Sequence, residues 1–254
     1  MAFSVAAPQW RVDHDREQAA LTALAAGADQ LHLDFGGPRR GARLDTPGQL
    51  AAARDIARTI ATPALAVDYV TEIGLADAES TAILDAALDC ALELGVRVLH
   101  VPDSSESAHG FPERRAKART ALSRICERAE DRLVVAYESK LGAADSVALI
   151  REVGHAALRA VLDTGNLIEA GHDPTEFAAT TQLAGVLHTD IHVKAPRSAR
   201  TDGFAVLPAL ASRGAVGSVL VKNDYRENTR LLSSDIMRCR RLGPRQSKTV
   251  RLPY

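Results

Sequence analysis

The sequence predicts an α/β protein of the (β/α)8 TIM barrel class, folded as a single domain. Short apolar runs rich in Val, Leu and Ile alternate with helical patterns eight times along the 254 residues. This alternation is typical of buried parallel strands joined by helical crossovers. Eight units can close into a barrel, whereas an open doubly wound sheet usually has about five or six strands. The glycine-rich fingerprint of dinucleotide-binding folds is missing after the first strand, where the sequence reads APQWRVD.

The first unit begins with a strand at residues 3–8. Asp13 is positioned to cap the helix that follows, and Leu21 and Leu24 fall on its apolar face. The second strand lies at residues 27–35 and leads into the loop GGPRRGAR.

The next two units carry clear helix signals. Pro47 marks a helix start, because Pro at the first helical position sacrifices no hydrogen bond, and this helix runs to about Thr59. A strand at residues 64–70 precedes the most regular helix, residues 77–94, with Gly95 where a C-terminal cap is expected. Its apolar stripe comprises Ile83, Leu84, Ala87, Ala91 and Leu94.

The C-terminal half continues the alternation. Its strands are expected within residues 97–102, 134–140, 158–166, 185–196 and 217–222, and its clearest helices within 113–129, 203–212 and 226–238. The barrel domain therefore spans residues 1–239. Residues 240–254 are basic, contain two prolines, and are predicted to form an extended C-terminal tail.

Composition limits the class of partner. The formal net charge of −1 does not favour a nucleic-acid-binding surface. The three cysteines, Cys90, Cys126 and Cys239, are interpreted as buried thiols in a reducing compartment. No signal-peptide pattern and no run of 18 apolar residues occurs, so we expect a cytoplasmic protein without a membrane partner. A homo-oligomer is compatible with the sequence.

Polar side chains follow three neighbouring predicted strands. They are Glu138 with Lys140, Asp163 with Asn166, and His188 with His192 and Lys194. Because the carboxyl ends of parallel strands open on one side of the sheet, these groups should converge. Two carboxylates and an imidazole form a candidate metal or acid/base site.

The phrases around these residues resemble the sugar phosphate isomerase/epimerase group of the xylose isomerase-like TIM barrels. The matching phrases are AYES at Glu138, DTGN at Asp163 with a following GHDP at His172, and IHVK at His192. The resemblance implies that Glu138, Asp163 and His192 bind a divalent metal (Mn, Mg or Zn), together with a glutamate that ends strand eight.

Strand eight departs from this pattern, because Lys222 stands where the final glutamate belongs. One interpretation is a metal-free site in which the ammonium neutralises Glu138 and Asp163, since a cation about 4 Å from a divalent ion is strongly repelled. The other retains the metal. Asp224 lies on the same side of a continuing strand as Lys222, so it is a candidate fourth ligand. The sequence leaves both open.

Several further side chains are candidates for binding substrate. They are Lys140, His188, Lys194, His172 and His100. The lysines that end strands five, seven and eight favour a small anionic substrate. His100, like His32, lies within a strand, where packing is the commoner role, and for His188 structural and functional roles are equally compatible with the pattern.

The leading hypothesis is an isomerase or epimerase that acts on a small hydroxycarbonyl or sugar-derived compound. Glu138 is the candidate general base. Asp163 and His192 would hold a metal or the substrate, and Lys222 would stabilise the oxyanion or return the proton. One alternative is a metal-independent lyase, dehydratase or cyclase that uses Lys222. Another is a non-catalytic carbohydrate-binding barrel.

Overall fold

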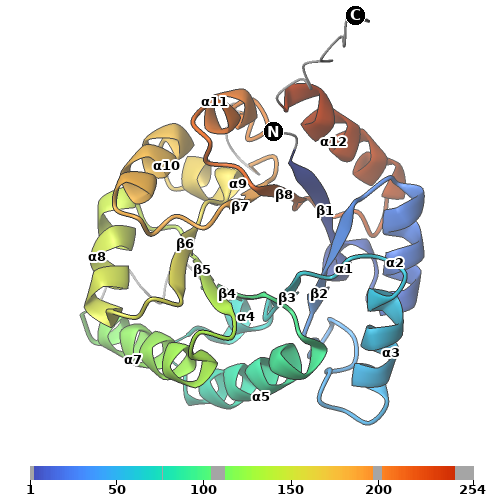
Figure 1. Ribbon diagram of the computed structural model, residues 1–254, viewed down its shortest axis with the longest axis horizontal. Helices are drawn as coiled ribbons and strands as arrows, with labels where there is room; N and C mark the ends of the chain where they lie inside the picture. The colour runs from blue at the N-terminus through green and yellow to red at the C-terminus, as the bar shows by residue number, and fades with distance from the viewer. Residues whose placement is uncertain (1–2, 76, 104–111, 197–201, 244–254) are drawn as a thin grey trace, which may run out of the picture.

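The protein is a single barrel of parallel strands surrounded by helices (Figure 1), seen here in a computed structural model. The structure describes residues 3–75, 77–103, 112–196 and 202–243. The strands are β1 (Ser4–Pro8), β2 (Gln30–Asp34), β3 (Ala64–Ala66), β4 (Val98–Pro102), β5 (Val134–Glu138), β6 (Leu158–Val161), β7 (Asp190–Val193) and β8 (Ser218–Val221). They confirm the predicted (β/α)8 class.

The strands pair in the order β6-β5-β4-β3-β2-β1-β8-β7, and every pair is parallel. The edge strands β6 and β7 meet through isolated parallel bridges, Ala160 with Leu187 and Asp163 with His192. These bridges bring the sheet round to a nearly closed barrel. As a consequence, the C-terminal ends of strands five to eight lie next to one another.

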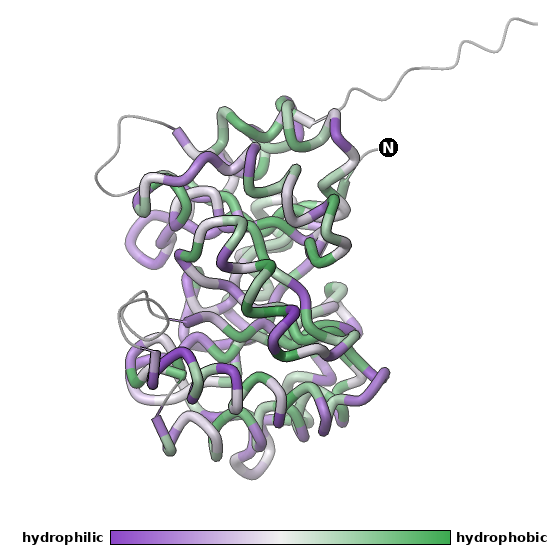
Figure 2. Tube along the Cα trace, turned by 90° about the vertical axis from the view of Figure 1, so that its left-hand side faces the viewer, coloured by the Kyte–Doolittle hydropathy of each residue, from purple (hydrophilic) through white to green (hydrophobic). Residues whose placement is uncertain are grey.

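Helices surround the strands, the longer ones in an outer ring and short ones closer to the strands (Figure 1). They are α1 (Gln9–Val12), α2 (Arg16–Ala25), α3 (Gln49–Ala57), α4 (Val70–Ile73), α5 (Ala78–Leu94), α7 (Pro112–Ala129), α8 (Ala143–Val153), α9 (Thr164–Glu169), α10 (Pro174–Leu183), α11 (Leu207–Ser212) and α12 (Thr229–Leu242). Hydrophobic and hydrophilic positions alternate along them (Figure 2), as expected for helices that cover a sheet with one face. No helix in the described part of the chain is long and apolar enough to cross a membrane.

Alternate strand residues divide into two sets, as the period of two requires. Leu65, Leu99 and Val135 join the large core cluster that also contains helix residues such as Leu84. Two smaller clusters are separate from it: Ala6, Trp10, Ala66 and Leu220, and Ala64, Val98, Ala136 and Val161. These fill the inside of the barrel, where alanines occupy positions that bulky branched residues usually fill.

Two predicted details of helix α2, the helix expected after the first strand, are wrong. Asp15, not Asp13, caps α2, because its side chain accepts a hydrogen bond from the Gln18 N–H at 2.9 Å. Leu21 and Leu24 are 54% and 38% exposed. The buried face of α2 instead contains Ala19, Ala20 and Ala23, whose small side chains let the helix pack closely.

Other boundaries shift by a few residues. Helix α3 begins at Gln49 after Gly48, two residues beyond the predicted start at Pro47. Helix α12 continues to Leu242, three residues past the expected end of the domain, and residues 244–254 of the predicted tail lie outside the described residues. The regular helix α5 is as expected: Gly95 caps it in the left-handed conformation, at φ 69°. All three cysteines are buried and free.

The loop after β2 is fastened to the barrel by Arg16, whose side chain is only 7% exposed. Its guanidinium donates to the carbonyls of Asp34 (2.9 Å), Phe35 (3.2 Å) and Ala42 (2.8 Å), and to the side chain of Gln49 (2.9 Å). One side chain thus ties the end of β2 to residue 42 of the loop and to Gln49 at the start of α3.

Replacing Arg16 by Met should reduce the free energy of unfolding by about 3 kcal/mol, because all the hydrogen bonds of its guanidinium are lost at once. Urea denaturation measures the change. Arg54→Met is the matched control, since the ion pair of Arg54 with Glu93 is about half exposed and worth at most about 1 kcal/mol. Equal losses in the two variants would contradict the role assigned to Arg16.

Candidate functional site

Glu138, the last residue of β5, is the centre of a buried polar cluster and is 3% exposed. Lys222 Nζ lies 2.6 and 2.5 Å from its two carboxylate oxygens. His192 Nδ1 lies 2.8 Å from Oε2, and Asn166 Nδ2 donates to Oε1 at 2.8 Å. Each of these partners comes from a different strand end, so the barrel topology assembles the cluster.

Asp163 is held by the turn that follows β6. Its Oδ1 accepts the Asn166 N–H at 2.8 Å and caps helix α9, whereas its Oδ2 accepts no hydrogen bond from the described residues. The nearest cations to Oδ2 are Lys194 Nζ at 3.5 Å and Lys222 Nζ at 3.6 Å. Glycine at position 165 leaves room for the Lys194 side chain, because a Cβ there would lie 2.4 Å from Lys194 Cγ.

Lys222 follows β8 and is 3% exposed. Its backbone N–H donates to the Val193 carbonyl at 2.8 Å, which continues the β7–β8 pairing by one residue. Its Nζ lies within 3.6 Å of Glu138, Asp163 and His192, the three residues that the family resemblance assigns to a metal. The ammonium therefore lies in the middle of the expected ligand set.

The contacts determine the charge states. Burial lowers the pKa of Lys222, but Glu138 and Asp163 outweigh it and raise the pKa above its ordinary value. Burial raises the pKa of Glu138, but Lys222 and His192 outweigh burial and hold it well below the ordinary range. Burial lowers the pKa of His192. At neutral pH the cluster thus contains an ammonium, a carboxylate and a neutral imidazole that donates from Nδ1 to Glu138.

Two further carboxylates end strands two and three. Asp34 is fully buried, and its oxygens accept the N–H groups of Gly36 at 2.9 Å and Asp68 at 3.1 Å. Burial and the neighbouring Asp68 raise the pKa of Asp34 to about 7. Arg40 pairs with Asp68, so this arginine of the GGPRRGAR loop already has a partner. Neither aspartate is among the site residues predicted from sequence, although their positions at or just after strand ends were a usable signal.

The other predicted substrate-binding residues lie in varied surroundings. Lys140 pairs with Glu169 at 3.2 Å and is about a third exposed, and Lys194 Nζ donates to Asn166 Oδ1 at 2.7 Å. His172 is exposed, with its ring against Gly142. His188 and His100 lie deeper in the barrel: His188 Nε2 is 3.3 Å from Asp190, and the His100 ring is 4.8 Å from that of His192.

Asp224 does not join the cluster, contrary to its prediction as a fourth ligand. Its side chain is 48% exposed and pairs with Arg226. The alternation argument fails because β8 ends at Val221, so residue 224 no longer follows the period of two.

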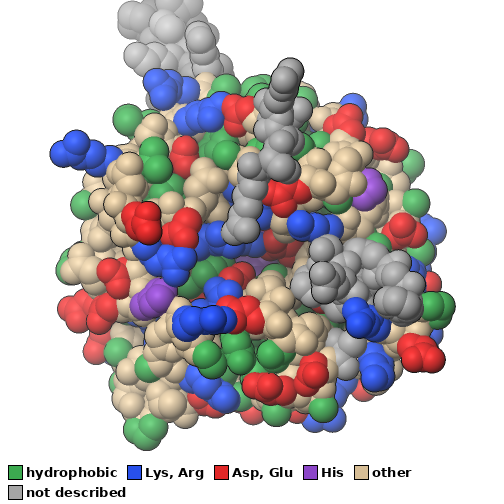
Figure 3. Space-filling view, turned by 180° about the vertical axis from the view of Figure 1, so that it is seen from behind, with side chains coloured by type: hydrophobic (Ala, Val, Ile, Leu, Met, Phe, Trp, Pro, Cys, Tyr) green, Lys and Arg blue, Asp and Glu red, His purple; other side chains and the backbone are tan. Residues whose placement is uncertain are grey.

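On the face seen in Figure 3, Lys and Arg side chains gather near the centre beside Asp and Glu side chains.

The fold and the convergence of side chains at the strand ends define a barrel with a polar site at its mouth. A family model described as xylose isomerase-like TIM barrel matches residues 20–208. The chain belongs to this family, as its sequence predicted.

Relatives support the same class. The chain is 33% identical over 243 residues to 2-epi-5-epi-valiolone 7-phosphate 2-epimerase from Actinoplanes sp., and the match covers 89% of each chain. The fold is similar to D-allulose 3-epimerase from Methylomonas sp. (TM-score 0.72, 14% identity, 93% of this chain and 95% of that one). It is also similar to 3-keto-D-glucoside 4-epimerase from E. coli (TM-score 0.72, 14% identity, 94% and 99%).

Lys222→Glu should tighten Mn²⁺ binding by about 100-fold or more, because it removes the ammonium from the ligand set and adds a carboxylate. Electron paramagnetic resonance of free Mn²⁺ measures the affinity. Lys140→Glu makes the same charge change at a neighbouring strand end and should leave the affinity nearly unchanged. Equal Mn²⁺ affinities in both variants and the wild type would mean that Lys222 does not lie among Glu138, Asp163 and His192.

Asp34 gives a prediction for pH. Its folded pKa of about 7 exceeds the ordinary 3.8, so between these values the folded state binds more protons than the unfolded state. Stability should therefore fall as pH rises through this window, by up to about 1.4 kcal/mol per pH unit. The side chain in Asp34→Asn cannot ionise. Between pH 5 and 8, the unfolding free energy of Asp34→Asn should therefore rise relative to that of the wild type as the pH increases. Asp55→Asn, on the surface, should show no such trend, and parallel curves for wild type and Asp34→Asn would contradict the shift.

Proposed function

We propose that this protein is an epimerase that inverts a stereocentre next to the carbonyl of a sugar-derived ketone, one that carries a phosphate. The 33% identical relative is named for a phosphorylated ketone, and the match covers most of both chains. Glu138, Asp163, His192 and Lys222 form the mouth cluster. This cluster supplies the acid and base that such proton transfer requires.

The contact between Lys222 and Glu138 carries this proposal. Epimerisation by two groups needs one that is deprotonated and one that is protonated at the same time. A buried carboxylate 2.5 Å from a buried ammonium provides both in one resting state. Because the charges stabilise each other, neither group needs a pKa near 7 to be in the required form.

The mouth cluster does not fit a divalent metal in this proposal, although Glu138, Asp163 and His192 have ligand atoms within 4.8 Å of one another. Lys222 Nζ already lies 2.5 Å from Glu138 and 3.6 Å from Asp163. A divalent ion bound to the same oxygens would face the ammonium at about 4 Å or less, where repulsion in a buried site is severe. We therefore assign the chemistry to the side chains themselves.

The reaction is a proton exchange on carbon. Glu138 removes the proton next to the carbonyl, the C–H bond breaks, and its electron pair forms an enolate. Inversion requires the substrate carbon to enter between Glu138 and Lys222 and to part their contact. Lys222 then delivers a proton to the opposite face of that carbon, which leaves a neutral amine and a protonated carboxyl. When product leaves, Glu138 returns its proton to Lys222 through their direct contact, so the pair is restored without another reagent.

Three neighbouring residues assist this pair. His192 and Asn166 donate to Glu138 and fix the orientation of its carboxylate. Lys194, which is about one-sixth exposed, offers a cation beside Asp163 for an anionic group of the substrate.

The proposal is tested in D₂O with 2-epi-5-epi-valiolone 7-phosphate, following deuterium entry at carbon 2 and inversion separately by NMR. Glu138→Gln should slow both by at least about 100-fold, because no base remains. Lys222→Met should lower the ratio of inversion to exchange by at least about tenfold, since Glu138 can still return a proton to the face it came from.

Lys117→Met is the control and should retain both rates, because Lys117 is exposed on helix α7, outside the cluster. Loss of inversion and exchange in equal proportion in Lys222→Met would remove Lys222 as the second proton-transfer group. Full activity of Glu138→Gln would overturn the proposal. A product that has lost water would indicate a dehydratase on the same site.

A further inference from the structure

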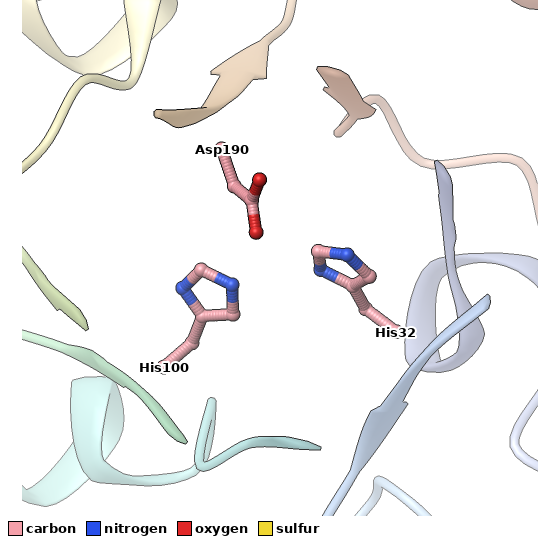
Figure 4. A group of neighbouring side chains, drawn as sticks. All are labelled: His32, His100 and Asp190. Carbon is pink, nitrogen blue, oxygen red and sulfur yellow. The ribbon is translucent and has the colours of Figure 1, made fainter. Parts of the chain in front are cut away.

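A second group of candidate ligands lies inside the barrel, apart from the mouth cluster. It comprises His32 of β2, His100 of β4 and Asp190 of β7, whose side chains point toward one another across the barrel interior (Figure 4). One ligand atom from each lies within 4.8 Å of the other two. His32 and Asp190 each precede a mouth residue, Asp34 and His192, by two positions, so the group lies one layer below the mouth.

The two histidines have no other role in the described structure. His32 is 0% and His100 2% exposed, and neither ring nitrogen of either residue has a hydrogen-bond partner among the described residues. Leaving such groups without a partner costs about 1–3 kcal/mol each. Their rings stack with centroids 5.3 Å apart, which places the nitrogens near one another but satisfies none of them.

Asp190 is oriented as a ligand would be. The Ser218 hydroxyl donates to its Oδ1, and His188 Nε2 lies 3.3 Å from its Oδ2. Second partners of this kind fix the carboxylate of metal sites. Within the described chain, no lysine or arginine forms an ion pair with Asp190, whereas the mouth cluster contains Lys222.

We infer that His32, His100 and Asp190 form a binding site for a divalent transition metal of the zinc or cobalt type. Two imidazoles and one carboxylate are a donor set that suits such ions, whereas manganese and magnesium favour oxygen. Ligand bonds of about 2.0–2.2 Å place donors roughly 3–4 Å apart, so the three side chains need to close by about 1 Å. This site is independent of the proposed epimerase chemistry.

Small neighbours make that movement feasible. Ala64, Ala66 and Ala136 face the barrel interior in place of bulkier residues. His188 lies close to His100, with a ring-centroid distance of 6.0 Å, and can supply a further nitrogen. The barrel ties the ligands to three separate strands, so the bound ion would cross-link β2, β4 and β7.

Cobalt is the probe for the test. Protein freed of metal with a chelator is titrated with Co²⁺, and binding is followed by visible absorption and calorimetry. We expect one equivalent to bind, with X-ray absorption showing two imidazoles and a carboxylate. His32→Gln and His100→Gln should each weaken binding by at least about tenfold, and Zn²⁺ should raise the Tm of the wild type but not that of either histidine variant.

Two control variants distinguish cobalt binding at His32, His100 and Asp190 from binding at the mouth cluster or at another histidine. Glu138→Gln removes a mouth residue and His155→Gln a histidine outside the cluster, and both should bind Co²⁺ like the wild type. The inference is overturned if wild-type protein takes up no cobalt, if the bound ion has only water and surface ligands, or if Glu138→Gln loses binding while the His32 and His100 variants retain it. Because the X-ray absorption result uses wild-type protein, it decides the question even if a histidine variant fails to fold.

Discussion

The buried contact between Lys222 and Glu138 is the constraint on which the site depends. Both side chains are about 97% buried, and each would be costly without the other, because removing one partner of a buried pair typically costs about 3–5 kcal/mol. The pair also fixes the remaining charges: His192 stays neutral and donates to Glu138, and Asp163 faces two ammonium groups. We propose that this single lysine after strand eight replaces metal chemistry with proton transfer between side chains.

Much of this arrangement was predictable from sequence. The eightfold alternation predicts the barrel, and the rule that parallel strands end on one side predicts that Glu138, Asp163 and His192 converge. The family resemblance adds Lys222 to this group. Helix α5 was predicted well because its apolar stripe and Gly95 cap agree with each other. Where several local signals point the same way, the structure follows them.

The rest depends on geometry that local patterns do not contain. Asp224 was misplaced because the end of β8 is decided by pairing with its neighbours, not by composition. Leu21 and Leu24 were assigned to the core because hydrophobicity alone cannot show that alanines give closer packing on α2. The interior group at His32 was interpreted as packing, since no sequence pattern reveals that both of its ring nitrogens lack partners.

In the proposed mechanism, proton transfer at the barrel mouth needs no metal. The most direct measurement is the turnover of 2-epi-5-epi-valiolone 7-phosphate, read as deuterium entering carbon 2, before and after exhaustive treatment with a chelator. The account predicts the same rate in both samples and no increase when Mn²⁺ is added. A rate that disappears with the chelator and returns with Mn²⁺ would contradict it, because Lys222 could not then remain among Glu138, Asp163 and His192 during the reaction.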